Sequence, residues 1–288
     1  LGHEVSIEVI MEQSPTQELS PVIHAKLLDL VAQYLAIGGM PEAVKSWREF
    51  NDPRRCSLVH AALLDAYRQD FEKYAKKAQL PYLHILFDRI PHQFGKKFNY
   101  SKIGQELRKR ELAPCLDLLI TAGVIHKTMY SAGQGIPIGA QADPEVFKVI
   151  FVDVALSQKI LGLGFTDWLL NPLEQFVNKG DVVEAFVGQE LLAYADPLFR
   201  PHLSYWRREE RASEAEVDYL TQLQEHVIPI EVKSGAGSTL KSMHMFLESH
   251  TGSPYGLRFS TQNYSGYEKI HSYPLYAVAQ ALGANVTL

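Results

Sequence analysis

The sequence predicts a mixed α/β fold in which helices dominate the first part and strands the last. Two observations predict it. Apolar residues of the first part recur at the spacing of an amphipathic helix, as at Leu27, Leu30, Val31 and Tyr34. Between residues 202 and 234, polar and apolar residues instead alternate in three successive runs, which is the period of a β-strand.

Several helices are expected in the first part, after one short strand. Residues 4–10 alternate and indicate that strand. Ser20 and Pro21 are typical of a helix start, and the pair Gly38-Gly39 ends the helix that follows. Further helices are expected to begin at Pro41 and to cover residues 54–79 and 82–94.

The middle of the chain shows the order of a winged helix, in which a helix–turn–helix precedes a two-stranded hairpin. This order extends over residues 99–156, with Ser101 as the expected N-cap of the first helix and Gly123 as the end of the second. The two strands are predicted at residues 124–131 and 148–156, joined by a loop rich in Gly, Pro and Ala.

The last region is predicted to hold a helix, three strands in meander order, a second helix, two further strands and a closing helix. The first helix is expected over residues 181–195 and the three strands over 202–209, 214–223 and 226–234. We therefore divide the chain into a remnant of a preceding domain or lid (1–50), a helical and winged-helix-like domain (51–160), a connector (161–180) and an α/β domain (181–288).

Composition argues against several classes of protein. The formal net charge is −5 and the pI about 6.1, so nucleic-acid binding would need a local basic patch. Cys56 and Cys115 have no Cys or His neighbour at metal-ligand spacing, which argues against a zinc site. No apolar run reaches about 18 residues, so no membrane helix is expected. A cytoplasmic protein with two reduced thiols is expected, and its oligomeric state stays open.

The N-terminus lacks the basic and apolar regions of a secretory signal. It also lacks an initial Met. We expect the chain to begin inside a larger protein.

A carboxylate, a turn and a Glu-x-Lys sequence follow one another within residues 216–235. Strand alternation places Glu231 and Lys233 on one face, and Asp218 on the same face of its own strand as Leu220. If the two strands pair, Asp218 and Glu231 lie side by side. Adjacent carboxylates repel unless a cation lies between them, and Mg²⁺ or Mn²⁺ prefers oxygen ligands. The pattern predicts a divalent-metal site at which Lys233 assists a bound water or stabilises developing charge.

A third carboxylate is expected from the preceding helix. Glu184, Val187 and Leu191 fall on one stripe of that helix. An acidic residue on a stripe that faces the sheet needs a partner. Glu184 is therefore the predicted third ligand, and Glu190 is the alternative.

This constellation resembles the PD-(D/E)xK nucleases. The resemblance implies a restriction-endonuclease-like fold for residues 181–288, with Glu184, Asp218, Glu231 and Lys233 as catalytic residues. A Glu-x-Lys pair on a strand also occurs by chance, and a fold does not fix a function. Whether the chain is an enzyme therefore stays open.

Five segments in order resemble the C-terminal part of bacterial and archaeal AAA-type ATPases that carry a DUF4143 domain. They are YLAIGGMPEAV (34–44), FVDVAL (151–156), VEAFVGQEL (183–191), YWRREERASEAEVDYL (205–220) and PIEVKSG (229–235). The resemblance implies a winged-helix-like middle, a nuclease-like end and an N-terminal P-loop ATPase domain in the full protein. That domain would be a partner of this chain.

The nucleotide-binding motif of such an ATPase, G-x-x-x-x-G-K-[ST], is absent. The only Gly-Lys pair is Gly95-Lys96, and Ile90 stands five positions before Gly95. ATP binding and hydrolysis are therefore expected only of a longer protein.

A local basic patch overlaps the predicted helix–turn–helix and interleaves with Phe98 and Tyr100. Such a patch could contact DNA phosphates; its alternative is a solvated helix face above two core aromatics. It consists of Lys96, Lys97, Lys102, Arg108, Lys109 and Arg110.

Two functions follow. One is a Mg²⁺- or Mn²⁺-dependent phosphodiesterase that acts on DNA. The other is a DNA-binding or protein-interaction scaffold that uses the same fold without catalysis. A short distance between the carboxylates of Asp218 and Glu231 in an open cleft would favour the first.

Overall fold

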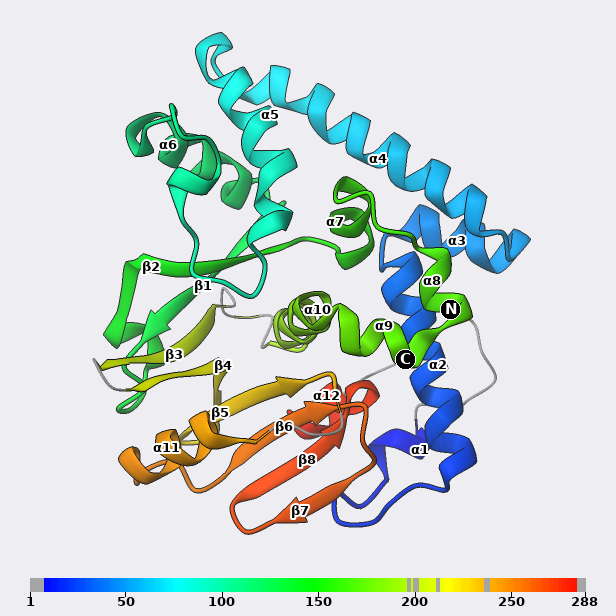
Figure 1. The fold of residues 1–288 in the computed structure, drawn as a ribbon, viewed down its shortest axis with the longest axis vertical. Coiled ribbons are helices and arrows are strands. Elements are labelled where there is room, and N and C mark those ends of the chain that lie inside the picture. Colours follow the sequence, from blue (N-terminus) through cyan, green and yellow to red (C-terminus); the bar gives the residue numbers. More distant parts are fainter. Residues whose placement is uncertain (1–7, 196–197, 199–201, 211–212, 236–238, 284–288) are drawn as a thin grey trace. The chain divides into compact units, whose positions relative to one another are not determined.

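The structure confirms the α/β class: helices accompany one mixed eight-stranded sheet (Figure 1). The computed structural model describes residues 8–195, 198, 202–210, 213–235 and 239–283. Its described residues form two compact units, each built from separate parts of the sequence. Residues 32–127 and 148–172 form the first unit, and the other described residues form the second.

The first unit is helical. Four elements, α2 (Pro21–Ile37), β1 (Ile125–Ser131), β2 (Ala142–Phe151) and α9 (Pro172–Asn178), have residues in both units. The remaining elements of the first unit are α3 (Pro41–Phe50), α4 (Pro53–Tyr74), η1 (Lys77–Gln79), α5 (Leu80–Arg89), η2 (Ile90–Gln93), η3 (Tyr100–Lys102), α6 (Lys109–Thr121), α7 (Val154–Ile160) and α8 (Thr166–Leu170).

A buried aspartate joins two helix starts in this unit. Asp153 is the N-cap of α7, where its Oδ1 accepts hydrogen bonds from Ala155 N and Leu156 N, both at 2.9 Å. Its Oδ2 accepts a third from Gly39 N at 2.7 Å. The preceding Gly38 has φ +75°, and a Cβ there would meet Asp153 Oδ1 at 2.5 Å. Both the backbone conformation and the close approach therefore require glycine at this position.

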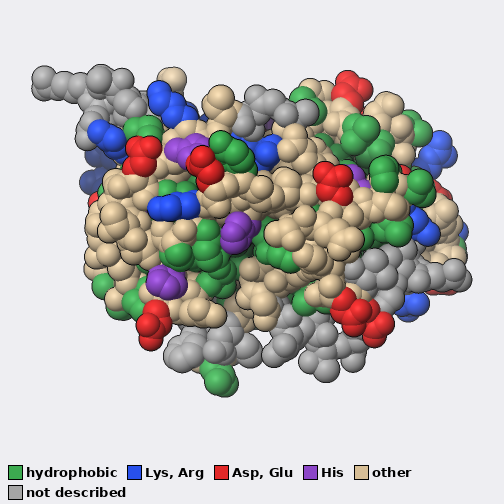
Figure 2. All heavy atoms as spheres, turned by 90° about the horizontal axis from the view of Figure 1, so that it is seen from below, with side chains coloured by type: hydrophobic (Ala, Val, Ile, Leu, Met, Phe, Trp, Pro, Cys, Tyr) green, Lys and Arg blue, Asp and Glu red, His purple; other side chains and the backbone are tan. Residues whose placement is uncertain are grey.

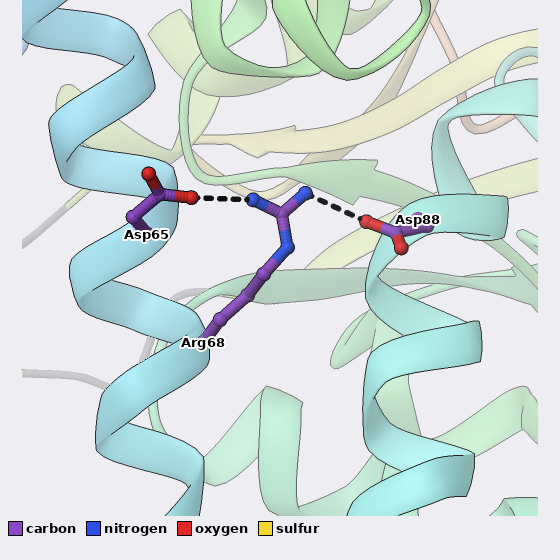
Figure 3. Close-up of polar contacts among 3 residues, drawn as sticks. All are labelled: Asp65, Arg68 and Asp88. Atoms are coloured by element: carbon purple, nitrogen blue, oxygen red, sulfur yellow. Dashed lines mark hydrogen bonds and ion pairs between the residues drawn. The ribbon is translucent and has the colours of Figure 1, made fainter.

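A surface arginine links the two long helices α4 and α5. Figure 3 shows Arg68 between two carboxylates, donating to Asp65 at 3.1 Å and to Asp88 at 2.9 Å. Both carboxylates are well exposed. Water therefore screens these ion pairs.

The second unit holds most of the sheet. The strand order is β2-β1-β3-β4-β5-β6-β8-β7. Its remaining elements are α1 (Glu8–Met11), η4 (Ile138–Gln141), α10 (Gly180–Ala193), β3 (Leu203–Glu210), β4 (Ser213–Leu223), β5 (His226–Lys233), α11 (Lys241–Ser249), β6 (Gly256–Ser260), β7 (Ser265–Tyr267), β8 (Ile270–Pro274), η5 (Leu275–Ala277) and α12 (Val278–Ala281).

The predicted meander is confirmed, because β3, β4 and β5 pair antiparallel in succession. Beyond it, β5 pairs parallel with β6, and β6 pairs parallel with β8. The helices α10 and α11 both pack on this sheet (Figure 1). The core beneath α11 is apolar and contains Trp206, Val217, Leu220, Phe246 and Leu247.

Several local predictions differ from the structure. Residues 8–11 form the helix α1 rather than a strand, and the rest of the predicted strand 4–10 lies outside the described residues. The helix expected after Ser101 is only the short 3-10 turn η3, whose N-cap is Asn99. The second strand of the hairpin covers 142–151 instead of 148–156, because Asp153 ends it by capping α7.

The hairpin is also not a free wing. Residues Thr128–Tyr130 of β1 pair parallel with Leu203–Tyr205 of β3, so this part of the hairpin extends the eight-stranded sheet. Local sequence patterns predict strands but not the distant strand with which each will pair.

The face drawn in Figure 2 mixes acidic, basic and hydrophobic side chains rather than presenting a continuous basic surface. Among the described residues, no single helix has the length and apolar character to cross a membrane. In the same part of the chain, only α2 and α3 taken together have that length and apolar character, and the two helices are bent by 120° relative to each other.

Candidate functional site

A β-bulge in β4 positions Asp218. The pairing of β3 with β4 shifts by one residue between Ser204↔Leu220 and Trp206↔Val217, so β4 carries one extra residue at Asp218–Tyr219. Such a bulge bends a strand and re-aims its side chains. The expectation that Leu220 shares a face with Asp218 is therefore wrong: Leu220 packs with Val217 in the core beneath α11.

The carboxylate of Asp218, on β4, accepts a hydrogen bond from a backbone N–H group of β5. The register Tyr219↔Ile230, continued by one residue, places Asp218 opposite Glu231. One further step would pair Val217 with Val232, but the Val232 N–H instead donates to Asp218 Oδ2 at 2.8 Å. The bond fixes one oxygen of Asp218 against β5, next to Glu231.

Glu231 is the most unusual side chain of this region. It is 3% exposed, and its Oε1 lies 2.5 Å from the Nζ of Lys233. Its other oxygen, Oε2, is buried and has no hydrogen-bond partner among the described residues. A buried carboxylate oxygen without a partner is costly, so a proton, a cation or a ligand is expected to occupy that position.

Burial above all, together with the nearby Asp218 and Glu184, raises the pKa of Glu231 to about 8 against the opposing effect of Lys233. Burial lowers the pKa of the Lys233 ammonium, but Glu231, Asp218 and Glu184 together outweigh burial and raise that pKa. The site therefore holds one proton more readily than separate groups in water would.

Glu184 lies on the helix α10, the helix from which the third carboxylate was expected. Glu184 is half-buried, and Val187 and Leu191 of the same stripe are buried. The Tyr219 hydroxyl donates to the backbone oxygen of Glu184 at 2.8 Å, which ties this turn of α10 to β4. The charge of Glu184 acts on both Glu231 and Lys233. The four predicted residues thus influence one another electrostatically.

The alternative ligand, Glu190, lies in the last turn of α10. Its carboxyl group hydrogen-bonds to Tyr194, and burial raises its pKa to about 7. Its partner is thus the tyrosine at the C-cap of α10, whereas the charges that act on Glu231 come from Asp218, Lys233 and Glu184.

The donor set suits a hard cation only in part. Within the described parts of the chain, no group of three or more His, Cys, Asp and Glu side chains is arranged to hold a metal ion. Mg²⁺, however, is commonly held by one or two carboxylates and completes its shell with water and substrate phosphate. Asp218 and the unpartnered Oε2 of Glu231 match that smaller requirement.

Sequence reasoning missed Arg258 of β6. It is the register partner of Glu231 on the adjacent parallel strand. Its Nε is buried without a hydrogen-bond partner among the described residues, and burial lowers the pKa of its guanidinium. The only sequence signal is one arginine within the otherwise apolar and small stretch GLRFS.

The six basic residues predicted to bind nucleic acid belong to the first unit and are all exposed. Lys109 lies over the Tyr100 ring, 5.8 Å from its centroid. Phe98 is buried and packs edge-on against Tyr100 at 5.0 Å. The aromatics thus support the local fold, and the basic side chains lie at the surface.

Comparison with family models divides the chain in two. Residues 179–278 match a domain of unknown function, DUF4143. The C-terminal region is thus similar to DUF4143 domains. Residues 28–167 match a different domain of unknown function, DUF8612. The segments 34–44 and 151–156 therefore lie outside the DUF4143 match. No curated protein and no solved structure matched the chain.

The DUF4143 match contains all four residues of the candidate site, Glu184, Asp218, Glu231 and Lys233. The six basic residues lie in the DUF8612 match instead. Neither family description states a function.

Proposed function

We propose that the DUF4143-like domain is a nucleic-acid-processing module whose reactive centre consists of Asp218, Glu231 and Lys233, with Glu184 beside it. The observation that supports this function best is the buried carboxylate of Glu231. It has a lysine on one oxygen and no partner on the other. Strongly perturbed carboxylates of this kind concentrate at functional sites.

Each residue has a distinct part in this proposal. Asp218 and Glu231 would hold Mg²⁺ or Mn²⁺, which supplies charge neutralisation of the phosphate and acidifies water. The Val232 N–H orients Asp218 through its hydrogen bond. Lys233, close to Glu231, would place its ammonium against the negative charge that develops on the phosphate. Burial of Glu231 excludes water from one side of the centre.

The test uses the full chain with single- and double-stranded DNA and with Mg²⁺ or Mn²⁺. We expect cleavage by the wild-type protein and a loss of at least about 100-fold in Asp218→Asn and Lys233→Met, as is usual when one stabilising group is removed. Glu190→Gln is the matched control, because it neutralises a carboxyl group of α10 away from the centre. A wild-type protein that cleaves no DNA form and binds neither ion by calorimetry would contradict the proposal.

A non-catalytic scaffold is the second candidate. The absence of a three-donor metal group in the described residues favours it, as does the Lys233 ammonium, which already neutralises Glu231 Oε1. In that case DNA binding would depend on the exposed basic residues of the DUF8612 region. The triple variant Lys96→Ala, Arg108→Ala, Lys109→Ala should then bind DNA more weakly and with a reduced salt dependence. Asp218→Asn should bind unchanged.

The resemblance to AAA-type ATPases suggests that both candidates act beside a P-loop ATPase domain. We propose this domain as the partner of the present chain and ATP as its ligand, not as a ligand of these residues. ATP hydrolysis by a longer protein, and none by residues 1–288, is the result expected from an ATPase assay.

A further inference from the structure

The first unit contains a pocket of about 500 Å³, and none of the residues of the proposed reactive centre lines it. It lies between the first turns of α4, the helix α7 and the segment Gly162–Thr166 that follows α7. Small-molecule sites typically measure about 300–1,000 Å³ and combine apolar walls with a few polar groups. The pocket has this size.

Both cations of the pocket lack a carboxylate. Arg54 and Lys159 line it, and no Asp or Glu does. In the described part of the chain, Lys159 has one polar partner, the Oγ of Ser57 at 2.8 Å, and neither cation forms an ion pair. Ser57 follows Arg54 by one helical turn, so the two lie on one face of α4. Two cations and a hydroxyl thus gather on one side, in a chain with net charge −5.

Apolar side chains also line the pocket. Leu58 is 71% exposed and Leu163 is 38% exposed, and both line the pocket together with Phe165. Large apolar side chains that remain exposed around a hollow commonly mark a binding site. Gln158, which also lines the pocket, is held in place by two hydrogen bonds: its Nε2 donates to Leu35 O at 2.8 Å, and its Oε1 accepts from Trp168 Nε1 at 2.7 Å.

We infer that this pocket binds a small organic anion, with a phosphate or carboxylate group on Arg54 and Lys159 and an apolar body against Leu58, Leu163 and Phe165. Charge-assisted hydrogen bonds supply the recognition of the anionic group. Burial of the two exposed leucines supplies affinity for the body. Both the hydrogen bonds to the anionic group and the burial of the apolar body contribute to the affinity, so a neutral ligand of the same shape should bind more weakly.

The test is calorimetry on the full chain with phenyl phosphate, phenylacetate and the neutral benzyl alcohol. We expect saturable binding of at least one anion and weaker binding of benzyl alcohol. Arg54→Met and Lys159→Met should each weaken anion binding by about tenfold or more, the value expected for one charge-assisted hydrogen bond. Tighter binding of phenyl phosphate would indicate a phosphate ester as the natural ligand, and tighter binding of phenylacetate a carboxylate.

The matched control is Arg55→Met. Arg55 is the next residue of the same turn, but it lies over the Phe50 ring and near Asp52 rather than in the pocket. Its removal changes the net charge equally and should leave binding within about twofold. A second variant, Leu58→Glu, places a negative charge on an exposed rim position that folding does not require. It should weaken anion binding as well.

Three results would overturn the inference: no saturable binding of either anion, equal binding of benzyl alcohol, or equal losses in Arg55→Met and Arg54→Met. Failure of DNA cleavage would leave this site untouched, because none of its residues belongs to the proposed reactive centre.

Discussion

The two units each bury a carboxylate to the same extent, and they satisfy it in opposite ways. Asp153 and Glu231 are both 3% exposed. Asp153 accepts three backbone hydrogen bonds, from Gly39, Ala155 and Leu156. Glu231 has one lysine and an unpartnered oxygen. The three hydrogen bonds of Asp153 stabilise the fold, whereas Glu231 keeps one oxygen that can still accept a hydrogen bond or bind a cation, as is typical of functional sites.

Removal of Asp153 should produce the largest effect on stability. Asp153→Ala leaves the buried N–H groups of Ala155 and Leu156 and the part-buried N–H group of Gly39 without an acceptor, and we expect the free energy of unfolding to fall by about 3–5 kcal/mol. Urea denaturation measures it. Asp52→Ala is the control, because Asp52 caps α4 from a more exposed position through Arg54 N and should cost only about 1 kcal/mol. Equal losses would remove the distinction between the two carboxylates.

Removal of Lys233 tests how much the buried carboxylate of Glu231 depends on its ion pair. In Lys233→Met the carboxyl group of Glu231 stays buried and becomes protonated, which limits the loss of stability to about 1–3 kcal/mol. The double variant Glu231→Gln, Lys233→Met contains no charge at either position and should recover most of that loss. Additive effects of the two substitutions in a double-mutant cycle would show that the ion pair contributes nothing.

Glu190 provides a pH-dependent test on the same helix as Glu184. Its pKa is about 7 in the folded protein and near 4.5 in the unfolded chain. The unfolded chain therefore releases this proton first, and the contribution of Glu190 to stability is complete below pH 4.5 and lost as the pH rises towards 7. We expect wild type to lose on the order of 1–3 kcal/mol over this range relative to Glu190→Gln. Parallel pH profiles of the two proteins would contradict the raised pKa.

The ion pairs of Arg68 with two exposed carboxylates should contribute least to the free energy of unfolding. Arg68→Ala should lower the free energy of unfolding by only about 0.5–1 kcal/mol, because water and salt screen both ion pairs of Figure 3. The effect should shrink when denaturation is repeated in 0.5 M salt. A loss as large as that of Asp153→Ala would show that exposure is a poor guide to the value of a carboxylate here.

Sequence patterns were sufficient for the three-strand meander of the second unit, because alternation depends only on neighbours along the chain. They were not sufficient for all of its elements, since residues 8–11 form the helix α1 and the strand β7 was not predicted. The Glu-x-Lys spacing placed Glu231 and Lys233 on one face of one strand, and their catalytic role stays a prediction. The bulge at Asp218–Tyr219 could not be predicted, since an extra residue is defined only by the partner strand. For the same reason Arg258 escaped notice: only the parallel pairing with β5 brings it beside Glu231.

The first unit was harder to predict, because its key contacts join distant segments. Gly38-Gly39 was interpreted as a helix end, and this was correct. That the same glycines also meet Asp153, more than a hundred residues later, depends on tertiary packing. The pocket beside α7 likewise combines residues 53–61 with 155–166, and no local sequence motif predicts it.

The extra residue in β4 acts as a phase shift in a repeating pattern. Before it, odd-numbered positions such as Ala215 and Val217 face α11; after it, the even-numbered Leu220 does. Deletion of one residue between Val217 and Leu220 would remove the bulge and leave these two residues two positions apart, on one face of a regular strand. A deletion elsewhere in β4 would instead reverse the phase of one half of the strand, so a scan of single-residue deletions along β4 should keep the core beneath α11 best when the deleted residue is Asp218 or Tyr219.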